Sequence, residues 1–246
     1  MCLAGRDNEC PGYEVLGYRQ HAGGYAEYVK VPIENLVSIP DTIDFVTAAA
    51  FPLTFLTAWH MIVTRGQLKR GEDVLVIAAG SGVGQAAIQI ARLHGARVFT
   101  TAGSAAKAER ARALGAEAVI DHHTQDVAAE ILKLTNRRGV DLVIEHVGEA
   151  IWPRAVRALA RGGRLVTCGA TTGSNGVIDL TALFAKQIAI LGSYMGTKGE
   201  LPRVARYFFA GELKPVVDRT FPLAEAAAAH AHMERSAHFG KIVLEV

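Results

Sequence analysis

The chain has 246 residues, 50% of them hydrophobic and 20% charged, with a formal net charge of +2. This composition is typical of a globular protein with a sizeable core, and it argues against the clustered basic face that nucleic-acid binding usually needs. Three cysteines in a chain of this length exclude a disulfide framework and favour a cytoplasmic location.

The first part of the chain, residues 1–44, lacks a regular pattern, although 25–32 (YAEYVKVP) predicts an antiparallel strand. The next stretch, 45–63, carries no charge and is long enough to span a bilayer. Because it contains Pro52, His60 and several threonines, we interpret it as a buried helix broken near Pro52. We expect no membrane segment.

From residue 73 onward, short apolar runs alternate with helical patterns. This is the pattern of a doubly wound parallel sheet, an α/β fold whose buried strands are continuously hydrophobic. The predicted strands are 73–80, 96–103, 118–121, 141–148, 163–170 and 188–196. The predicted helices are 84–95, 105–115, about 125–135, about 150–160, about 181–187 and about 223–234, before a last strand at 239–246. We therefore divide the chain into 1–44, a nucleotide-binding domain at 45–214, and a return segment at 215–246.

The first strand ends in a glycine-rich turn, AAGSGVGQ, with Gly80, Gly82 and Gly84 before a helix. Glycines let backbone amides approach a pyrophosphate, and the helix start adds a partial positive charge. The strict G-x-G-x-x-G pattern is not met. In a strand–loop–helix context, however, the turn predicts a dinucleotide site.

The second strand indicates which dinucleotide binds. NAD sites usually place an acidic residue at its end, whereas here the sequence is FTTAGSAAK. Ser104 is a natural helix cap, which puts Lys107 in the first helical turn, where a cation opposes the helix dipole. We interpret both residues as ligands of a 2′-phosphate, which favours NADP over NAD. An exposed, merely tolerated lysine is the alternative.

Several segments, in this order, resemble the medium-chain dehydrogenase/reductase superfamily, in its quinone-oxidoreductase-like and zinc-type alcohol dehydrogenase branches. These segments are GGYAEYVKVP, AAFPLTFLTAWHMI, GEDVLVIAAGSGVG, TAGSAAK, RGGRLVTCGATTG and FGKIVLEV. The resemblance implies that 1–44 is the remnant of a GroES-like β domain and that 215–246 returns to that domain.

The resemblance also gives the N-terminal cysteines a role. Zinc-type members carry a structural zinc lobe, C-x2-C-x2-C-x7-C, and Cys2 and Cys10 look like its third and fourth ligands. Structural zinc needs four ligands, so we expect half of a metal site, an N-terminal truncation, and structural zinc only in a full-length protein. Two unrelated thiols are the alternative.

The resemblance further implies chemistry without a catalytic zinc. Zinc-dependent relatives have a metal ligand just before a segment that matches Thr57-Ala58-Trp59, and the corresponding position here is about Leu53, which cannot bind zinc. No side chain is assigned as catalytic.

Residue by residue, the resemblance implies contacts with the cofactor along the whole chain. The expected pyrophosphate-binding residues are Gly80, Ser81, Gly82, Val83 and Lys241. His122 is expected beside the adenosine phosphate, and Gly169, Ala170 and Thr171 follow the fifth strand at the ligand-binding edge. Thr57, Ser193, Tyr194 and Met195 are expected near the nicotinamide.

We therefore expect an NADP(H)-dependent oxidoreductase that transfers hydride to a small molecule: a quinone, an enone or another activated carbonyl. Alcohol–aldehyde interconversion is the enzymatic alternative, and an inactive cofactor-binding module is the other. We expect a homodimer, paired through the sixth strand as in relatives, and no nucleic-acid or membrane partner.

Overall fold

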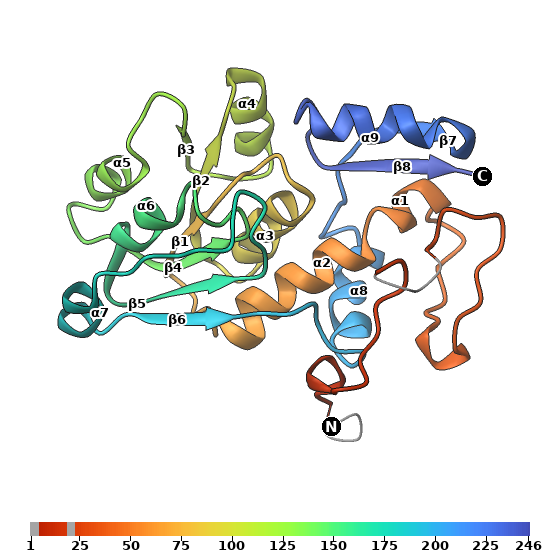
Figure 1. The fold of residues 1–246 in the computed structure, drawn as a ribbon, viewed down its shortest axis with the longest axis horizontal. Helices are drawn as coiled ribbons and strands as arrows, with labels where there is room; N and C mark the ends of the chain where they lie inside the picture. The colour runs from red at the N-terminus through yellow and green to blue at the C-terminus, as the bar shows by residue number, and fades with distance from the viewer. Residues whose placement is uncertain (1–4, 19–22) are drawn as a thin grey trace.

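The computed structural model describes residues 5–18 and 23–246. Its main body is a six-stranded sheet in the order β3-β2-β1-β4-β5-β6, and every neighbouring pair is parallel (Figure 1). The strands are β1 (Asp73–Val76), β2 (Arg97–Ala102), β3 (Ala118–Asp121), β4 (Val140–Glu145), β5 (Leu159–Thr167) and β6 (Ala189–Gly192). The predicted doubly wound α/β fold is confirmed.

Helices cover both faces of this sheet, while α1 and α9 lie beside the smaller sheet described below. The α-helices are α1 (Phe45–Ala49), α2 (Pro52–Trp59), α3 (Gly82–Leu93), α4 (Ala105–Ala113), α5 (Val127–Leu134), α6 (Trp152–Arg157), α7 (Leu180–Lys186), α8 (Leu201–Phe209) and α9 (Ala226–Glu234). Successive strand side chains point to opposite faces, so Val74 and Val76 join a core with α2, α3 and α8. Leu75 joins a second core with α5 and α6 on the other face.

The uncharged stretch at 45–63 is a buried, broken helix, as predicted. Helix α1 ends at Ala49, and α2 begins at Pro52, where proline's missing N–H costs no hydrogen bond. Helix α2 then continues into a π-helix, η4 (His60–Arg65). Among the described residues, no helix combines the length and apolarity that crossing a bilayer would take.

A small second sheet lies beside the main body. Its strands, β7 (Val217–Pro222) and β8 (Lys241–Glu245), are parallel and are connected through the short helix η5 (Leu223–Glu225) and α9. The strand predicted at 239–246 is therefore confirmed as β8. Figure 1 shows this unit at the same side of the molecule as residues 23–44.

The strand predicted at 25–32 is wrong. These residues form no strand and are mostly exposed, with 90% of Tyr28 accessible. A strand needs a neighbour to satisfy its backbone hydrogen bonds, and no described segment pairs with this one. Among the described residues before α1, the short elements are two 3-10 turns, η2 (Asp7–Glu9) and η3 (Ile33–Asn35). The division at residues 44 and 214 stays a prediction.

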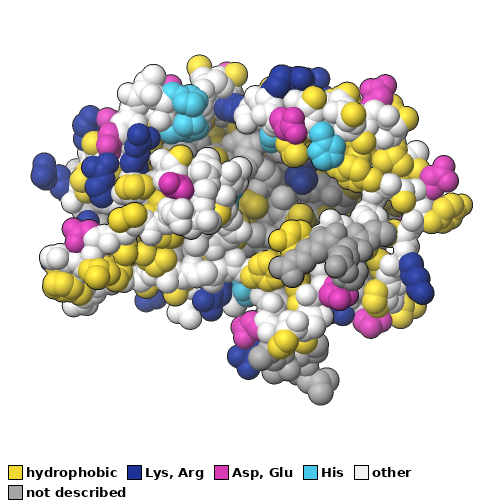
Figure 2. All heavy atoms as spheres, viewed as in Figure 1, with side chains coloured by type: hydrophobic (Ala, Val, Ile, Leu, Met, Phe, Trp, Pro, Cys, Tyr) yellow, Lys and Arg dark blue, Asp and Glu magenta, His cyan; other side chains and the backbone are white. Residues whose placement is uncertain are grey.

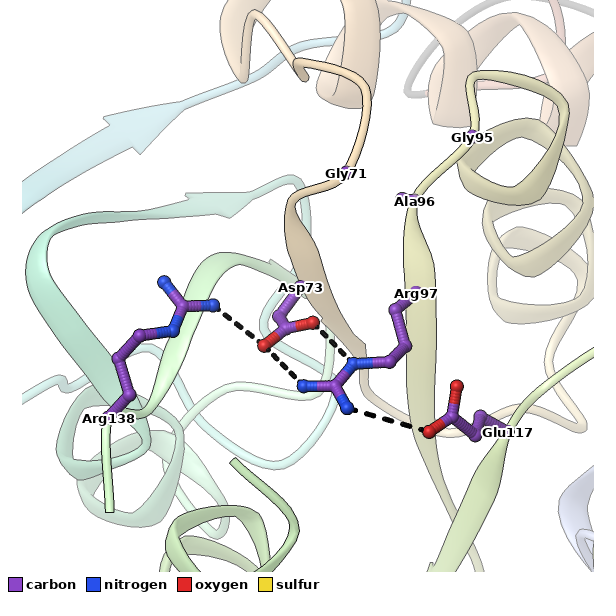
Figure 3. Close-up of a pocket in the computed structure, with 7 residues that line it drawn as sticks. All are labelled: Gly71, Asp73, Gly95, Ala96, Arg97, Glu117 and Arg138. Carbon is purple, nitrogen blue, oxygen red and sulfur yellow. Dashed lines mark hydrogen bonds and ion pairs between the residues drawn. The ribbon is translucent and has the colours of Figure 1, made fainter. Parts of the chain in front are cut away.

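A network of charges ties the amino ends of the strands together (Figure 3). Asp73 lies between Arg97, at 2.6 Å, and Arg138, at 2.7 Å. The Asp73 amide also donates to Asp141, which accepts from Arg138. The surrounding hollow is lined by Gly71, Asp73, Gly95, Ala96, Arg97, Glu117 and Arg138. The charges in this hollow pair with one another, and the hollow lies at the edge of the sheet opposite the glycine turn. We therefore assign the hollow a structural role.

We predict that Asp73→Asn destabilises the fold by about 1.5–3 kcal/mol at pH 7, the range for hydrogen bonds to charged groups. Burial raises the pKa of Asp73, but hydrogen bonds from Arg97 and Arg138 outweigh burial and lower it. A depressed carboxyl pKa contributes stability above the unfolded value, near 4, so the difference should shrink as pH falls below about 4. Urea denaturation across this pH range measures it.

Glu130→Gln is the control for this prediction, because the Glu130–Lys133 pair is a surface i,i+3 contact and such pairs contribute at most about 1 kcal/mol. Equal stabilities of Asp73→Asn and the unchanged protein at pH 7 would contradict the structural role.

Candidate functional site

The glycine turn between β1 and α3 is built for close approach to an anion. Ser81 caps α3 by accepting the Gly84 amide at 2.8 Å. A Cβ on Gly84 would lie 2.1 Å from the Ala78 carbonyl oxygen, so only glycine fits there. The first amides of α3 and its dipole therefore face the carboxyl edge of the sheet, beside the point where strand order reverses between β1 and β4.

Lys241, at the start of β8, lies over this turn. A Cβ on Gly82 would come within 3.0 Å of the Lys241 Cδ and 2.7 Å of Thr54 Cγ2. Burial lowers the pKa of Lys241, and within residues 5–18 and 23–246 no carboxylate or hydrogen bond compensates its ammonium. A partly desolvated cation beside bare amides is what a phosphate-binding site provides.

His146, which directly follows β4, is a site residue that sequence reasoning missed. Its Nε2 lies 2.8 Å from Ser81 Oγ, so it contacts the residue that caps α3. Its Nδ1 is buried without a partner in the described structure. Burial lowers the pKa of His146 to about 4, so the imidazole is neutral at physiological pH. Its place near the carboxyl end of the fourth predicted strand, 141–148, was the only available signal.

The turn after β4 is held by Glu145. This buried carboxylate accepts the amides of Val147 and Gly148 and the Thr167 hydroxyl. An isolated charge in an apolar strand is thus fully compensated. Glu145 shapes the edge of the site, together with the loop after β5, where a Cβ on Gly169 would lie 2.7 Å from the His146 carbonyl oxygen.

Ala170 and Thr171 extend this second loop. The Thr171 hydroxyl donates to the His146 carbonyl. The structure therefore brings the predicted residues after β5 against the residue after β4, on the side of the switch point away from β2 and β3.

Ser104 and Lys107 lie at the carboxyl end of β2. Ser104 caps α4 by accepting the Lys107 amide at 3.3 Å, as its sequence context predicted. The Lys107 ammonium donates to the Ser236 carbonyl at 2.5 Å. Its Cδ lies 3.3 Å from the Cβ position of Gly80, so Lys107 borders the glycine turn. Lys107 is therefore anchored, with donors left for a further acceptor.

His122 and its neighbour His123 follow β3 and lie beside Ser104. Their ring centroids are 4.4 Å apart, and a Cβ on Gly103 would meet both rings, within 3.1 Å and 2.7 Å. Burial and then His123 lower the pKa of His122. Figure 2 shows histidine and basic side chains gathered over the β3 end of the sheet. His123 was not predicted.

The residues expected near the nicotinamide lie on the other half of the sheet edge. Ser193, Tyr194 and Met195 follow β6, and Tyr194 is 53% exposed. Met195 has a φ of +53°, a conformation uncommon outside glycine. On α2, the Thr57 hydroxyl donates to the Leu53 carbonyl at 2.7 Å, so its hydrogen atom is already used inside the helix.

Leu53 has a side chain that cannot ligate metal, and within the described residues no cluster of three His, Cys, Asp or Glu side chains could hold a metal ion. Cys10 is a free, partly buried thiol, and Cys2 lies outside the described residues. The half zinc site stays a prediction. Burial, with a further contribution from Glu145, raises the pKa of Cys168 to about 12, as suits a core thiol.

A sequence profile described as "Zinc-binding dehydrogenase" matches residues 82–210. The chain is also 32% identical, over 232 residues, to the quinone oxidoreductase of Homo sapiens, covering 91% of this chain and 69% of that protein. The chain belongs to the medium-chain dehydrogenase/reductase superfamily. Its relatives there are oxidoreductases, so the family assignment supports an oxidoreductase.

Solved structures also support this family assignment. A crystal structure of an NAD-dependent alcohol dehydrogenase superposes with a TM-score of 0.95 at 47% identity, covering 100% of this chain and 71% of that one. The 2-octenoyl-CoA carboxylase reductase CinF, in complex with NADP and 2-octenoyl-CoA, gives a TM-score of 0.83 at 33% identity, covering 90% of this chain and 54% of that one.

The chain spans only part of these proteins. It is also 37% identical, over 258 residues, to a phenolphthiocerol/phthiocerol polyketide synthase polypeptide of Mycobacterium tuberculosis. That match takes in 97% of this chain but only 11% of the synthase polypeptide. This superfamily unit thus also occurs as a small segment of a much longer enzyme.

Proposed function

We propose that this chain binds NADP(H) and takes part in hydride transfer to a quinone, an enone or a related activated carbonyl, without a catalytic zinc. The observation that carries the proposal is the uncompensated Lys241 cation over the glycine turn. The Lys241 cation and the glycine turn both favour binding of a pyrophosphate. The similarity to human quinone oxidoreductase favours hydride transfer to a quinone or a related carbonyl.

The choice of NADP rests on the β2 and β3 ends. No acidic side chain follows β2, where a ribose 2′-hydroxyl ligand would be expected. Ser104, Lys107 and the His122–His123 pair converge there instead, and the Lys107 ammonium, with hydrogen-bonding groups beside it, suits a 2′-phosphate. The NADP complex of CinF supports this choice, whereas the NAD-dependent alcohol dehydrogenase, at higher identity, favours NAD.

A bound nicotinamide supplies the hydride. The chain's own residues would bind and orient the cofactor. The amides of Gly80, Gly82 and Val83 would hold the pyrophosphate together with Lys241, and Ser81, whose own amide donates to the Ala78 carbonyl, would shape the turn as the cap of α3. Thr57 and the Ser193–Met195 loop would contact the nicotinamide. The substrate carbonyl is polarised by hydrogen bonds, and solvent supplies the proton. Leu53 offers no metal ligand, which supports chemistry without a catalytic zinc.

Two alternatives have specific support. Alcohol–aldehyde interconversion is favoured by the 47% identity to an alcohol dehydrogenase. An inactive cofactor-binding module is favoured because the chain spans 69% of the human quinone oxidoreductase. Turnover assays separate the three: NADPH oxidation with quinones or enones supports our proposal, activity with alcohols alone supports the first alternative, and NADPH binding without any turnover supports the second.

A homodimer through β6 is also part of the proposal. Strand β6 is an edge strand whose outer side has no partner in the described chain, and the nearby apolar side chains Val177, Leu180 and Phe184 are exposed. Figure 2 shows apolar side chains over this end. Pairing with a second copy would remove the open edge, and light scattering that gives the monomer mass would contradict it.

We predict that Lys241→Met weakens NADPH binding by about 10–100-fold, because a charge-assisted contact contributes about 1.5–3 kcal/mol. The same change should leave the unliganded fold equally stable or more stable, because it removes a partly desolvated charge that lacks a partner. Fluorescence titration and thermal unfolding measure the two effects. Lys214→Met, at an exposed lysine, is the control; equal affinities for both variants would overturn the pyrophosphate site.

We predict that Lys107→Met weakens NADPH binding by about 10-fold and leaves NADH binding unchanged, because only NADPH carries the 2′-phosphate. NADH is the internal control in the same titration. An equal loss for both cofactors would mean that Lys107 acts only through its contact with Ser236. A clear preference of the unchanged protein for NADH would refute the NADP assignment.

A further inference from the structure

A buried histidine–carboxylate pair lies beneath the loop that follows β6. His60 Nδ1 is 3.0 Å and 2.9 Å from the two carboxylate oxygens of Glu200, and each side chain is 7% exposed. Glu200 also accepts the Thr64 hydroxyl and, at 2.8 Å, the Thr197 amide. Burial raises the pKa of Glu200, but these hydrogen bonds outweigh it and hold the pKa at about 2.

The other side of His60 faces Asn8. His60 Nε2 lies 3.3 Å from Asn8 Nδ2, which also donates to the Tyr194 carbonyl at 3.0 Å. If the Asn8 amide were flipped, its oxygen would face the Tyr194 carbonyl oxygen, and two acceptors cannot hydrogen-bond to each other. The Asn8 amide nitrogen therefore faces both the Tyr194 carbonyl and His60 Nε2. His60 therefore accepts at Nε2 and carries its proton on Nδ1, toward Glu200. A continuous hydrogen-bonded chain runs from Glu200 through His60 and Asn8 to Tyr194.

The same loop is held at other points by the N-terminal segment. The Asp7 carboxylate accepts the Lys198 amide at 3.0 Å, and the Tyr13 ring meets the Tyr194 ring edge-on at 5.9 Å. Between these contacts Met195 adopts its left-handed conformation. Such strain persists only where the surroundings fix the backbone, and here residues far away in the sequence fix it.

The position of the loop after β6 indicates the role of the His60–Glu200 pair. It follows β6 at the carboxyl edge of the sheet, on the half away from the adenosine-side residues. We propose that Asn8, His60 and Glu200 are positioning residues that fix the Tyr194–Met195 backbone at the reacting end of the cofactor. This inference rests on the proposed function. None of these side chains is placed in contact with cofactor or substrate.

The test compares Asn8→Ala and Glu200→Gln with the unchanged chain. Asn8→Ala removes the hydrogen bonds that Asn8 makes to His60 Nε2 and to the Tyr194 carbonyl, and it leaves the His60–Glu200 pair in place. We expect both variants to lower kcat by about 10–100-fold, as small misplacements near reacting groups do, with the NADPH dissociation constant within about 2-fold. Hydrogen–deuterium exchange of residues 193–200 should rise in both variants.

Glu72→Gln is the matched control. Glu72 pairs with Arg164 at 2.6 Å, is partly buried, and lies just before β1 at the opposite edge of the sheet. We expect it to lower the melting temperature without changing kcat or exchange at 193–200. If Asn8→Ala and Glu200→Gln behave like this control, the pair is only structural and the proposal is overturned.

The exchange measurement separates this inference from the proposed function. If the unchanged chain turns over no substrate, the proposed function fails, and faster exchange at 193–200 in Asn8→Ala still supports the positioning of the loop. Unchanged exchange overturns the positioning role whether or not the chain is active. If Glu200→Gln does not fold, Asn8→Ala, which removes no charge, decides the outcome.

Discussion

The close packing of α3 against the end of β1 is the constraint on which the site depends. Gly84 lies so near the Ala78 carbonyl that any side chain would overlap it, and this contact points the first amides of α3 over the sheet edge. The strand order reverses between β1 and β4 at the same place, which is where ligands bind in open α/β sheets. His146 and Lys241 reach the turn from either side, so segments from three parts of the chain converge on it.

The buried charged groups near this edge of the sheet differ in whether hydrogen bonds compensate their loss of water. The buried carboxylates of Glu145 and Glu200 each accept several hydrogen bonds, which compensates their loss of water. Lys241 has no such compensation in the part of the chain that the structure describes. A protein that satisfies its buried anions but leaves a cation beside bare amides is arranged to receive an anion, which is the physical basis of the cofactor proposal.

The sequence was sufficient for the six strands of the main sheet and for the helices between them, because buried parallel strands and amphipathic helices leave local patterns. Helix α8 and strand β7 were not predicted. The Ser104 cap was also readable, since a cap acts within three residues of its own position. The segment at 25–32 failed for the opposite reason: alternating residues favour a strand, but a strand forms only with a partner. His146 left no pattern, because its contact with Ser81 spans 65 residues.

The hydrogen-bonded chain of Asn8, His60 and Glu200 was also out of reach of sequence patterns, because its contacts join residues that are 52, 140 and 186 positions apart. His60 lies in a segment that resembles the superfamily, but nothing in that segment links it to Asn8 or Glu200. Burying a carboxylate together with its polar partners gains little stability compared with apolar packing, so a compact fold alone does not require the His60–Glu200 pair. The left-handed Met195 does require outside support, and this chain supplies it. The pair is therefore better explained by the loop it holds than by the core it occupies.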